Sequence, residues 1–414
     1  MRNRIIDRID RKIPSSQAAY RSGRSTTEHV FATKILAERA ISSRDETIYL
    51  ILLDMSKAFD TVDRAILLKD LSNTIEKDEL HIINIMLNIE LKVKCGNNYS
   101  YSFRTNVGVP QGDSLSANEF TFYLANALLE NGNKFCYEHD YTSFSVDVQK
   151  IVDHDHNYTK SIKQINIKQE YADDISMISN NATLIQHEKD NLPSVLKMRN
   201  LTVNETKTEE YTIARQGDES WKKCKLLGSL LSTSHDITRR KSLAMSAIEN
   251  MKSIFNGKVS LSVKLRAFEC YVAAIFLYNS ELWTLTSTLE KAIDSFQRRL
   301  LRTACLNAKW PKKISNHDLY EITKAAAWSK TIRKRQLSWF GHLSRMKDDT
   351  PAKLALSYVR SAHILRPKGR PPTTWISMMN SRLKECGKSW DEADEMARDR
   401  KKWQGFIKSC CDNW

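Results

Sequence analysis

Residues 47–60, TIYLILLDMSKAFD, contain the stretch on which the fold depends. Ile48 to Leu53 form an unbroken apolar run rich in residues that favour β-strands. Such a run is short enough for a strand that is buried on both faces. Because the run ends at Asp54, the sequence predicts a carboxylate at the end of a buried strand.

A second stretch, YADDISMIS at residues 171–179, places two adjacent aspartates before an alternating apolar pattern. We interpret Asp173 and Asp174 as part of a tight turn between two strands. Two like charges side by side repel each other, so water or a metal ion must accompany them. If the strands pair in one sheet, Asp54 and Asp173 can meet at its edge, where carboxylate oxygens suit Mg²⁺.

Two such ions about 3.5–4 Å apart can clamp the attacking and leaving oxygens of a phosphoryl transfer. The alternative is a solvated turn at Asp173 and Asp174 and a helix N-cap at Asp54. The residues ADD alone favour this alternative, and the two readings stay open at this level.

The bulk composition indicates a folded chain with an affinity for polyanions. At 414 residues and 41% hydrophobic content it is long enough for two or three domains, which excludes a disordered chain. The net charge of +15 attracts nucleic acid, although many soluble proteins are equally basic. The eight cysteines lack the spacing of a zinc site or a disulfide framework, which indicates a reducing compartment. With no signal peptide and no run that could span a bilayer, we expect a soluble intracellular protein.

The rest of the chain is organised around loops and helices. A helical pattern follows the loop YRSGRSTTEH, and residues 107–129 lead from a Gly/Pro loop into a helix with a capping box at Ser116 and Glu119. The polar segment 131–169 is expected to be an inserted loop. From about residue 239 the apolar stripes are helical, with a break at 366–375. A last helix is expected through Trp390, Ala393, Ala397, Trp403 and Ile407.

Five segments with domain-sized spacing carry a resemblance to a known family. From about Ile13 to the C-terminus, the chain resembles the reverse transcriptase of non-LTR (LINE-type) retrotransposons. The segments are, in order, LDMSKAFD (53–60), GVPQGDSLS (108–116), YADD (171–174), LTVNETKTE (201–209) and KLLGSLL (225–231).

The resemblance implies an α+β right-hand polymerase, with a mostly antiparallel palm sheet, a helical thumb and a small C-terminal helical region. The implied domains are partial fingers at 1–45, the palm at 46–215, the primer grip and thumb at 216–345, and the C-terminal region at 346–414. It also implies that the chain opens inside the fingers, without the upstream fingers segment and endonuclease domain of complete relatives.

Carried over by position, the resemblance assigns metal ligands to Asp54, the carbonyl of Met55, Asp173 and Asp174. These would hold two Mg²⁺ ions, with Mn²⁺ as a substitute. Lys207 would lie near the leaving pyrophosphate, where an ammonium stabilises charge or donates a proton. A solvated surface lysine is the alternative.

Four positions are implied to contact the nucleotide. Phe59 would lie under the sugar and clash with a 2′-hydroxyl, unless it is ordinary core. Gln111 and Gly112 would approach the templating base pair, with an ordinary loop-to-helix turn as the alternative. Arg21 would hold the triphosphate. Outside this set, Arg24 would contact template phosphate or be solvated.

The turn at Leu227 and Gly228 is implied to grip the primer strand. The basic helices that follow would track the template–primer backbone. Trp339, Phe340 and Trp375 could stack on bases, but core packing is the stronger expectation. His154 and His156 in DHDHNY are more consistent with a polar loop than with a metal site.

The resemblance therefore implies an RNA-directed DNA polymerase, which extends a primer 3′-hydroxyl or nicked target DNA with dNTPs on an RNA template. A cytoplasmic ribonucleoprotein or nuclear location would follow. The alternative is a catalytically silent nucleic-acid-binding remnant, favoured by the missing fingers strand, whereas the retained aspartates favour the enzyme. Ala117 and Gln169–Glu170 are smaller departures from the family's pattern. An RNA-templated RNA polymerase is disfavoured by Phe59.

Overall fold

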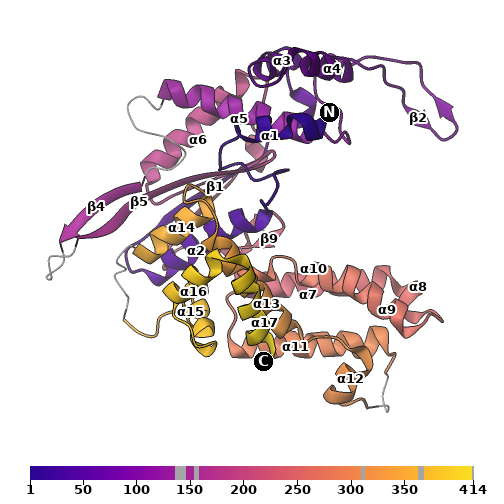
Figure 1. The fold of residues 1–414 in the computed structure, drawn as a ribbon, viewed down its shortest axis with the longest axis vertical. Helices are drawn as coiled ribbons and strands as arrows, with labels where there is room; N and C mark the ends of the chain where they lie inside the picture. Colours follow the sequence, from indigo (N-terminus) through magenta and orange to yellow (C-terminus); the bar gives the residue numbers. More distant parts are fainter. Residues whose placement is uncertain (136–145, 153–157, 309–312, 362–367, 413–414) are drawn as a thin grey trace. The chain divides into compact units, whose positions relative to one another are not determined.

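The computed structural model describes residues 1–414 apart from 136–145, 153–157, 309–312, 362–367 and 413–414 (Figure 1). His154 and His156 lie outside the described residues. The chain folds as two compact units. The first unit comprises residues 1–29, 45–214 and 349–364, and the second comprises 30–44, 215–348 and 365–414.

The first unit is built on a five-stranded sheet in the order β4-β5-β6-β1-β7. Every neighbouring pair is antiparallel. The strand expected at Ile48–Leu53 is confirmed as β1, which lies between two partners and has four buried and two half-buried residues. The other strands are β4 (Val146–Val152), β5 (Tyr158–Tyr171), β6 (Asp174–Ser179) and β7 (Glu209–Ile213).

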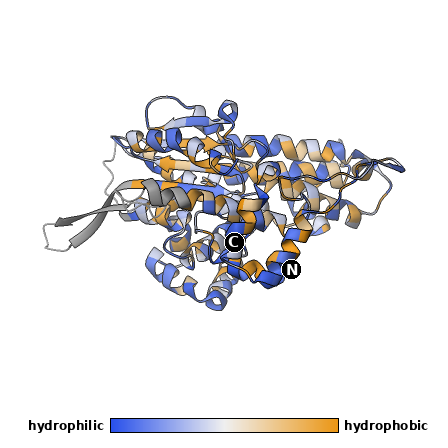
Figure 2. Cartoon of the chain, turned by 90° about the horizontal axis from the view of Figure 1, so that it is seen from above, coloured by the Kyte–Doolittle hydropathy of each residue, from blue (hydrophilic) through white to orange (hydrophobic). Residues whose placement is uncertain are grey.

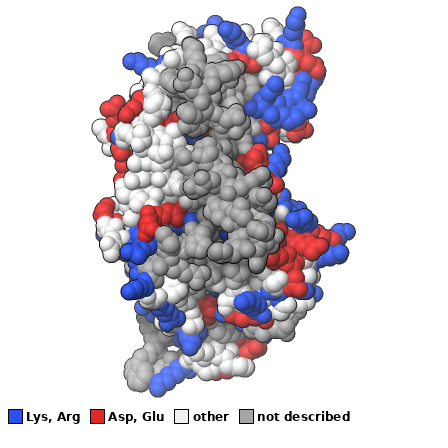
Figure 3. Space-filling model, turned by 90° about the vertical axis from the view of Figure 1, so that its left-hand side faces the viewer, with Lys and Arg blue, Asp and Glu red and all other residues white. Residues whose placement is uncertain are grey.

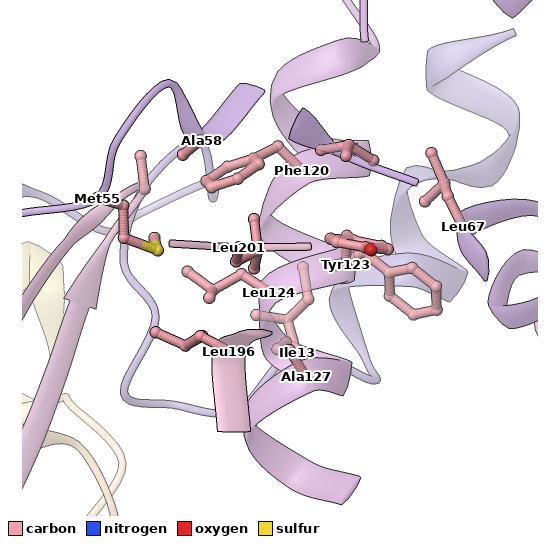
Figure 4. Packing of buried hydrophobic residues seen from close by; sticks show 14 of the residues in the cluster. Ile13, Met55, Ala58, Leu67, Phe120, Tyr123, Leu124, Ala127, Leu196 and Leu201 are labelled. Atoms are coloured by element: carbon pink, nitrogen blue, oxygen red, sulfur yellow. The ribbon is translucent and has the colours of Figure 1, made fainter. Parts of the chain in front are cut away.

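Helices supply the rest of the first unit's core. Figure 4 shows Phe120, Tyr123 and Leu124 of α5 packed among Met55, which follows β1, and residues from other helices. The helices are α1 (Arg2–Asp10), α3 (Arg64–Ser72), α4 (Lys77–Leu87), α5 (Ser116–Phe135), α6 (Ala182–Lys197) and α14 (Pro351–Ser361), and a small hairpin is formed by β2 (Lys94–Cys95) and β3 (Asn98–Tyr99). Short 3₁₀ turns, η1 (Ala58–Thr61) and η2 (Glu205–Lys207), follow β1 and precede β7.

Two expectations in this unit are wrong. The segment 131–169 is not an inserted loop, because α5 extends to Phe135 and β4 pairs with β5 as an antiparallel ribbon. Segment 131–169 is rich in polar residues, so its sequence does not show the apolar alternation that predicts a strand. The capping box is also absent: α5 begins at Ser116 itself, whose hydroxyl is buried without a hydrogen-bond partner, and the N–H of Glu119 bonds to the carbonyl of Leu115.

The second unit is helical, as expected, and includes most of α2 (Thr26–Ser42). After α2, this unit contains a hairpin of two short strands, β8 (Lys225–Leu226) and β9 (Ser229–Leu230). The larger helices are α7 (Thr233–Asn250), α9 (Leu261–Ala267), α11 (Ser287–Leu300), α12 (Asn316–Thr323), α13 (Trp328–Ser344), α15 (Trp375–Glu385), α16 (Trp390–Arg398) and α17 (Arg400–Asp412); shorter helical turns are α8 (Lys252–Asn256), η3 (Ser220–Lys223), η4 (Phe268–Ala273), α10 (Ala274–Phe276), η5 (Ser280–Leu282) and η6 (Leu301–Cys305).

The core of this unit is aromatic. Phe276 stacks on Trp328 with ring centroids 4.3 Å apart. Trp339, Phe340 and Trp375 are all buried, so the expectation of core packing is confirmed and base stacking by these rings is excluded.

The last expected helix is two helices. Asp399 has an extended conformation between α16 and α17, and its carboxylate accepts hydrogen bonds from the N–H groups of Lys401 and Lys402. An aspartate that caps a new helix therefore interrupts the helical backbone, although the apolar pattern continues across it.

The surface carries both polar and apolar side chains. In Figure 2 many helices carry both hydrophobic and hydrophilic residues, as amphipathic helices do. On the face drawn in Figure 3, basic and acidic side chains are interspersed. Among the described residues, no helix is both long and apolar enough to cross a bilayer.

Candidate active site

The candidate site lies at one edge of the sheet, where the last residue of β1 lies beside the start of its antiparallel partner β6. Leu53, the last residue of β1, pairs with Ile175, so Asp54 follows β1 beside the start of β6. Tyr171 pairs with Asp174, which leaves Ala172 and Asp173 as the two turn residues between β5 and β6. The structure thus brings Asp54 to the turn that carries Asp173, and Asp174 is the exposed first residue of β6.

The carboxylates of Asp54 and Asp173 interact electrostatically. Burial raises the pKa of Asp173, a backbone hydrogen bond opposes the shift, and the nearby charge of Asp54 adds to it. A pair of carboxylates that repel each other is a site where a cation lowers the free energy. Mg²⁺ is commonly held by one or two carboxylates together with substrate phosphates and water, so this pair fits such an ion.

The third carboxylate does not complete a metal cage by itself. Over residues 1–414, excluding the ranges left undescribed, no group of three or more His, Cys, Asp or Glu side chains is arranged to hold a metal ion.

Lys207 lies over Asp54. Its Nζ is 3.3 Å from Oδ2 of Asp54, although the lysine side chain is 66% exposed. The backbone explains this placement: the N–H of Asn204 donates to the carbonyl of Asp54, and the N–H of Ser56 donates to the carbonyl of Thr202. The segment before η2 therefore runs beside Asp54 and Met55, and Met55 is buried against it through a bridge to Val203.

The loop that contains Gln111 and Gly112 is fastened to η1. The N–H groups of Gly108 and Val109 donate to the carbonyls of Val62 and Phe59. Gly108 has φ of +81°, and a Cβ there would lie 2.9 Å from the carbonyl oxygen of Asp60, so only glycine fits. Nε2 of Gln111 donates to the carboxylate of Asp60 at 3.1 Å.

Gly112 has open space on the side where a Cβ would lie, and its φ is +97°. The loop is also held from α3, because Nε of Arg64 donates to the carbonyl of Gly108 at 2.7 Å and its Nη2 to the carbonyl of Val107 at 3.1 Å. The loop is therefore rigidly connected to the turn that follows Asp54.

Phe59 belongs to η1, five residues after Asp54. Its ring stacks on Phe120 of α5 with centroids 4.3 Å apart, and the side chain is half-buried. One face is thus supported by the core while part of the ring stays accessible. Both interpretations of Phe59, as core and as a sugar-facing ring, are compatible with this position.

Arg21 is not brought to the aspartates by any described contact. Its guanidinium pairs with Asp10 of α1 at 2.6 Å and donates to the carbonyls of Pro14 and Gln17. Arg24 likewise pairs with Glu28 and donates to the carbonyl of Ser15. Both arginines hold residues 14–17 in place in this structure.

The turn predicted as a primer grip belongs to the second unit. Leu227 and Gly228 both have positive φ, 44° and 80°, and join β8 to β9. The hydroxyl of Tyr278 donates to the carbonyl of Leu227 at 3.1 Å. Arg239 and Arg240 of α7 both donate to the carbonyl of Gly228, so two positive charges adjoin the turn.

Sequence reasoning missed several residues that shape the site. Gly108 and Arg64 fix the loop, and Gln17 contacts the turn at Ala172. The signal for Gly108 was its place before Val-Pro in a loop, where positive φ is common. Gln17 stood within the segment QAAYRSGRSTTEH, but its partner is 155 residues away, which no local pattern indicates.

Comparisons with known proteins agree with this geometry. Residues 1–231 match the family described as reverse transcriptase (RNA-dependent DNA polymerase). The chain is 24% identical over 180 residues to an uncharacterized transposon-derived protein of Caenorhabditis elegans, a match that covers 42% of this chain. The chain spans 64% of the length of that curated relative.

Solved telomerase structures are also similar. Apo telomerase of Candida tropicalis has a TM-score of 0.41 at 14% identity, over 88% of this chain and 60% of that one. Telomerase of Candida albicans in complex with a fragment of telomeric RNA has a TM-score of 0.37 at 12% identity, over 84% and 54%.

The family match covers more than half of the chain and includes the β1–β6 junction and the Gln111 loop. The right-hand polymerase fold expected from the sequence, with an antiparallel sheet and a helical region after it, agrees with the observed architecture. The chain therefore belongs to the reverse transcriptase family.

Proposed function

We propose that the protein is the RNA-directed DNA polymerase of a non-LTR retrotransposon. The observation that carries the proposal is the carboxylate pair of Asp54 and Asp173 at the ends of paired strands, beside the η1 turn and the Gln111 loop. The transposon-derived relative in Caenorhabditis elegans and the ordered motifs support the retrotransposon origin.

In this proposal Asp54 and Asp173 hold divalent cations, with Asp174 and the carbonyl of Met55 as further ligands. Bound Mg²⁺ would supply Lewis-acid stabilisation of the charge that develops on the α-phosphate and on the leaving oxygen. Lys207, now paired with Asp54, would turn its exposed ammonium toward the leaving pyrophosphate.

Phe59 would meet the sugar of the incoming nucleotide. Because Phe120 supports its ring from behind, the ring cannot withdraw easily from a 2′-hydroxyl. Gln111 and Gly112 would approach the nascent base pair, where Gly112 leaves room for a base. Arg21 would contact the triphosphate only after its ion pair with Asp10 opens.

The proposed partners are an RNA template, a DNA primer or nicked target DNA, and dNTPs. The net charge of +15 supports binding of nucleic acid. Arg239 and Arg240 beside the turn at Leu227 and Gly228 support contact with a primer phosphate. The related telomerase in complex with RNA is consistent with such partners.

Primer extension on an RNA template with Mg²⁺ and dNTPs tests the proposal. The wild type should extend the primer, and Asp173→Asn should not, while template–primer binding persists. Asp190→Asn is a matched control, since Asp190 is an exposed aspartate of α6 that accepts a hydrogen bond from Gln186. Loss of extension in both variants, or in neither, would contradict the assigned role of Asp173.

A catalytically silent nucleic-acid-binding protein is a second candidate. One observation favours it: the guanidinium of Arg21 is engaged by Asp10. Binding of a labelled dNTP in the presence of Mg²⁺ and template–primer separates the two. The polymerase binds the dNTP, whereas the silent protein binds only the template–primer.

A further inference from the structure

A short N-terminal segment, Ser16 to Ala19, runs alongside the end of β5. The N–H of Glu170 donates to the carbonyl of Ser16, and the N–H of Ala18 donates to the carbonyl of Glu170, both at 3.0 Å. This parallel bridge places Gln17 directly beside the residues that precede the β5–β6 turn.

The side chain of Gln17 then reaches the turn itself. Its Oε1 accepts the N–H of Ala172 at 3.1 Å, and its Nε2 lies 3.5 Å from the carbonyl of Ala172. Oε1 also accepts the N–H of Ala19 at 2.9 Å, and Gln17 is 1% exposed. The buried side-chain amide of Gln17 thus contacts both the N–H and the carbonyl of Ala172, the residue before Asp173.

Ala172 is in a conformation that needs such support. Its φ is +55°, in the left-handed region that residues with a Cβ rarely adopt. Strained backbone of this kind persists where the surroundings hold it, and it gathers at functional sites. Here the strain directly precedes Asp173, so the position of that carboxylate depends on what holds Ala172.

We propose that Gln17 is a positioning residue that fixes the β5–β6 turn, and with it the carboxylate of Asp173 relative to Asp54. The inference rests on the proposed function and adds to it a residue that never touches substrate. Gln17 acts through Ala172, because its amide bonds the backbone of that residue and holds a conformation the chain would otherwise leave.

The support extends outward from Gln17. Arg21 donates to the carbonyl of Gln17 at 3.0 Å while it pairs with Asp10, so α1 anchors the segment. On the other side, the ring of His29 meets Tyr171 edge-on with centroids 6.0 Å apart. In this arrangement Arg21 supports the turn indirectly, through Gln17.

Three variants test the proposal in primer extension. Gln17→Ala should lower kcat by about 10- to 100-fold, since a displacement of about 1 Å in a reacting group costs that much. The KM for template–primer should stay within about twofold, because Gln17 is buried and would not touch nucleic acid. The double variant Gln17→Ala/Ala172→Gly should recover most of kcat, because glycine adopts positive φ without strain.

Gln297→Ala is the matched control. Gln297 of α11 is equally buried and bridges two backbone groups in the same way, accepting the N–H of Trp328 at 2.9 Å and donating to the carbonyl of Ala326 at 2.8 Å. Its loss should destabilise the protein to a similar extent without the selective fall in kcat. An equal fall in kcat in Gln297→Ala, or no rescue by Ala172→Gly, would overturn the proposal.

Mn²⁺ binding, followed by electron paramagnetic resonance without nucleotide, separates this inference from the proposed function. Gln17→Ala should weaken Mn²⁺ binding by about tenfold, with recovery in the double variant, whether or not the wild type extends primers. Unchanged Mn²⁺ affinity in Gln17→Ala would overturn the positioning role. Absence of extension by a wild type whose Mn²⁺ affinity depends on Gln17 would instead overturn the proposed polymerase activity.

Discussion

At the scale of single residues, backbone strain and expected chemistry coincide. Non-glycine residues with positive φ include Lys57, Ala172 and Leu227. Lys57 lies between Asp54 and Phe59, Ala172 precedes Asp173, and Leu227 forms the β8–β9 turn. Since such conformations cost about 1–3 kcal/mol each, their presence at these three places supports a functional constraint there.

Phe59 gives the first prediction. Phe59→Ala removes the ring expected to exclude a 2′-hydroxyl, so discrimination between deoxynucleotides and ribonucleotides should fall by about tenfold or more. The ratio of kcat/KM for the two sugars measures it. Phe120→Leu removes the supporting ring but keeps the ring of Phe59, so it should lower the discrimination less than Phe59→Ala does. An unchanged ratio in Phe59→Ala would show that the ring is only core.

Gly108 and Gly112 form a matched pair for stability. Gly108→Ala should lower the free energy of unfolding by about 3 kcal/mol, from positive φ together with a clash against the backbone of Asp60. Gly112→Ala should lower the free energy of unfolding by only about 1 kcal/mol, because no atom lies within 4 Å of where its Cβ would be. Urea unfolding of both variants checks the difference, and equal losses would contradict the close approach at Asp60.

At the scale of elements, α5 carries a pH-dependent weakness. Burial, with a smaller contribution from the charge of Asp113, raises the pKa of Glu119 from 4.5 to about 7. The folded state therefore binds the proton more tightly than the unfolded state. The protonated carboxyl of Glu119 therefore contributes stability to the folded state. This contribution is fully present below about pH 4.5 and is lost as the pH rises through about 7.

Glu119→Gln should remove this dependence. At pH 8 the variant should be more stable than the wild type by about 3 kcal/mol, and near pH 4 the two should be similar. Urea unfolding at both pH values measures the difference. Asp113→Asn should shrink it only in part, because burial is the larger cause. A wild type whose stability is flat between these pH values would contradict the raised pKa.

The elements that sequence could predict are those with a one-sided pattern. Ile48–Leu53 is apolar enough to be a strand in any context, and the helices from residue 233 onward have clear stripes. The β4–β5 ribbon was not predicted because the sequence of residues 131–169 is largely polar and shows little of the apolar alternation that predicts a strand. The two final helices were read as one because Asp399 interrupts the backbone and not the apolar pattern.

At the scale of the whole molecule, the net charge predicts how nucleic acid binds. With +15 charges, affinity for template–primer should fall linearly with salt on a log–log plot, as counterions are released. Titration of a labelled RNA–DNA hybrid at several salt concentrations measures the slope. Arg239→Gln should make the slope shallower by about one phosphate contact. A slope unchanged in that variant would exclude Arg239 from the nucleic-acid contact.

The proximity of the candidate site's carboxylates could be predicted from the sequence, but the residues that support them could not. The order of motifs located Asp54, Asp173 and Lys207, and the sheet brings Asp54 to the turn of Asp173 because β1 pairs with β6. Gln17 and Arg64 act through contacts over 155 and 44 residues of separation, which depend on tertiary packing. Arg21 is the opposite case. The motif assigns its guanidinium to the triphosphate, but in the structure the guanidinium pairs with Asp10.

The central claim is that Asp54 and Asp173 together hold the cation for RNA-templated DNA synthesis. Single-turnover incorporation of one dNTP opposite an RNA template base, in Mg²⁺, tests it most directly. The account predicts incorporation by the wild type and a loss of at least about 1000-fold in Asp54→Asn, with template–primer binding retained. Equal incorporation by both proteins would contradict it.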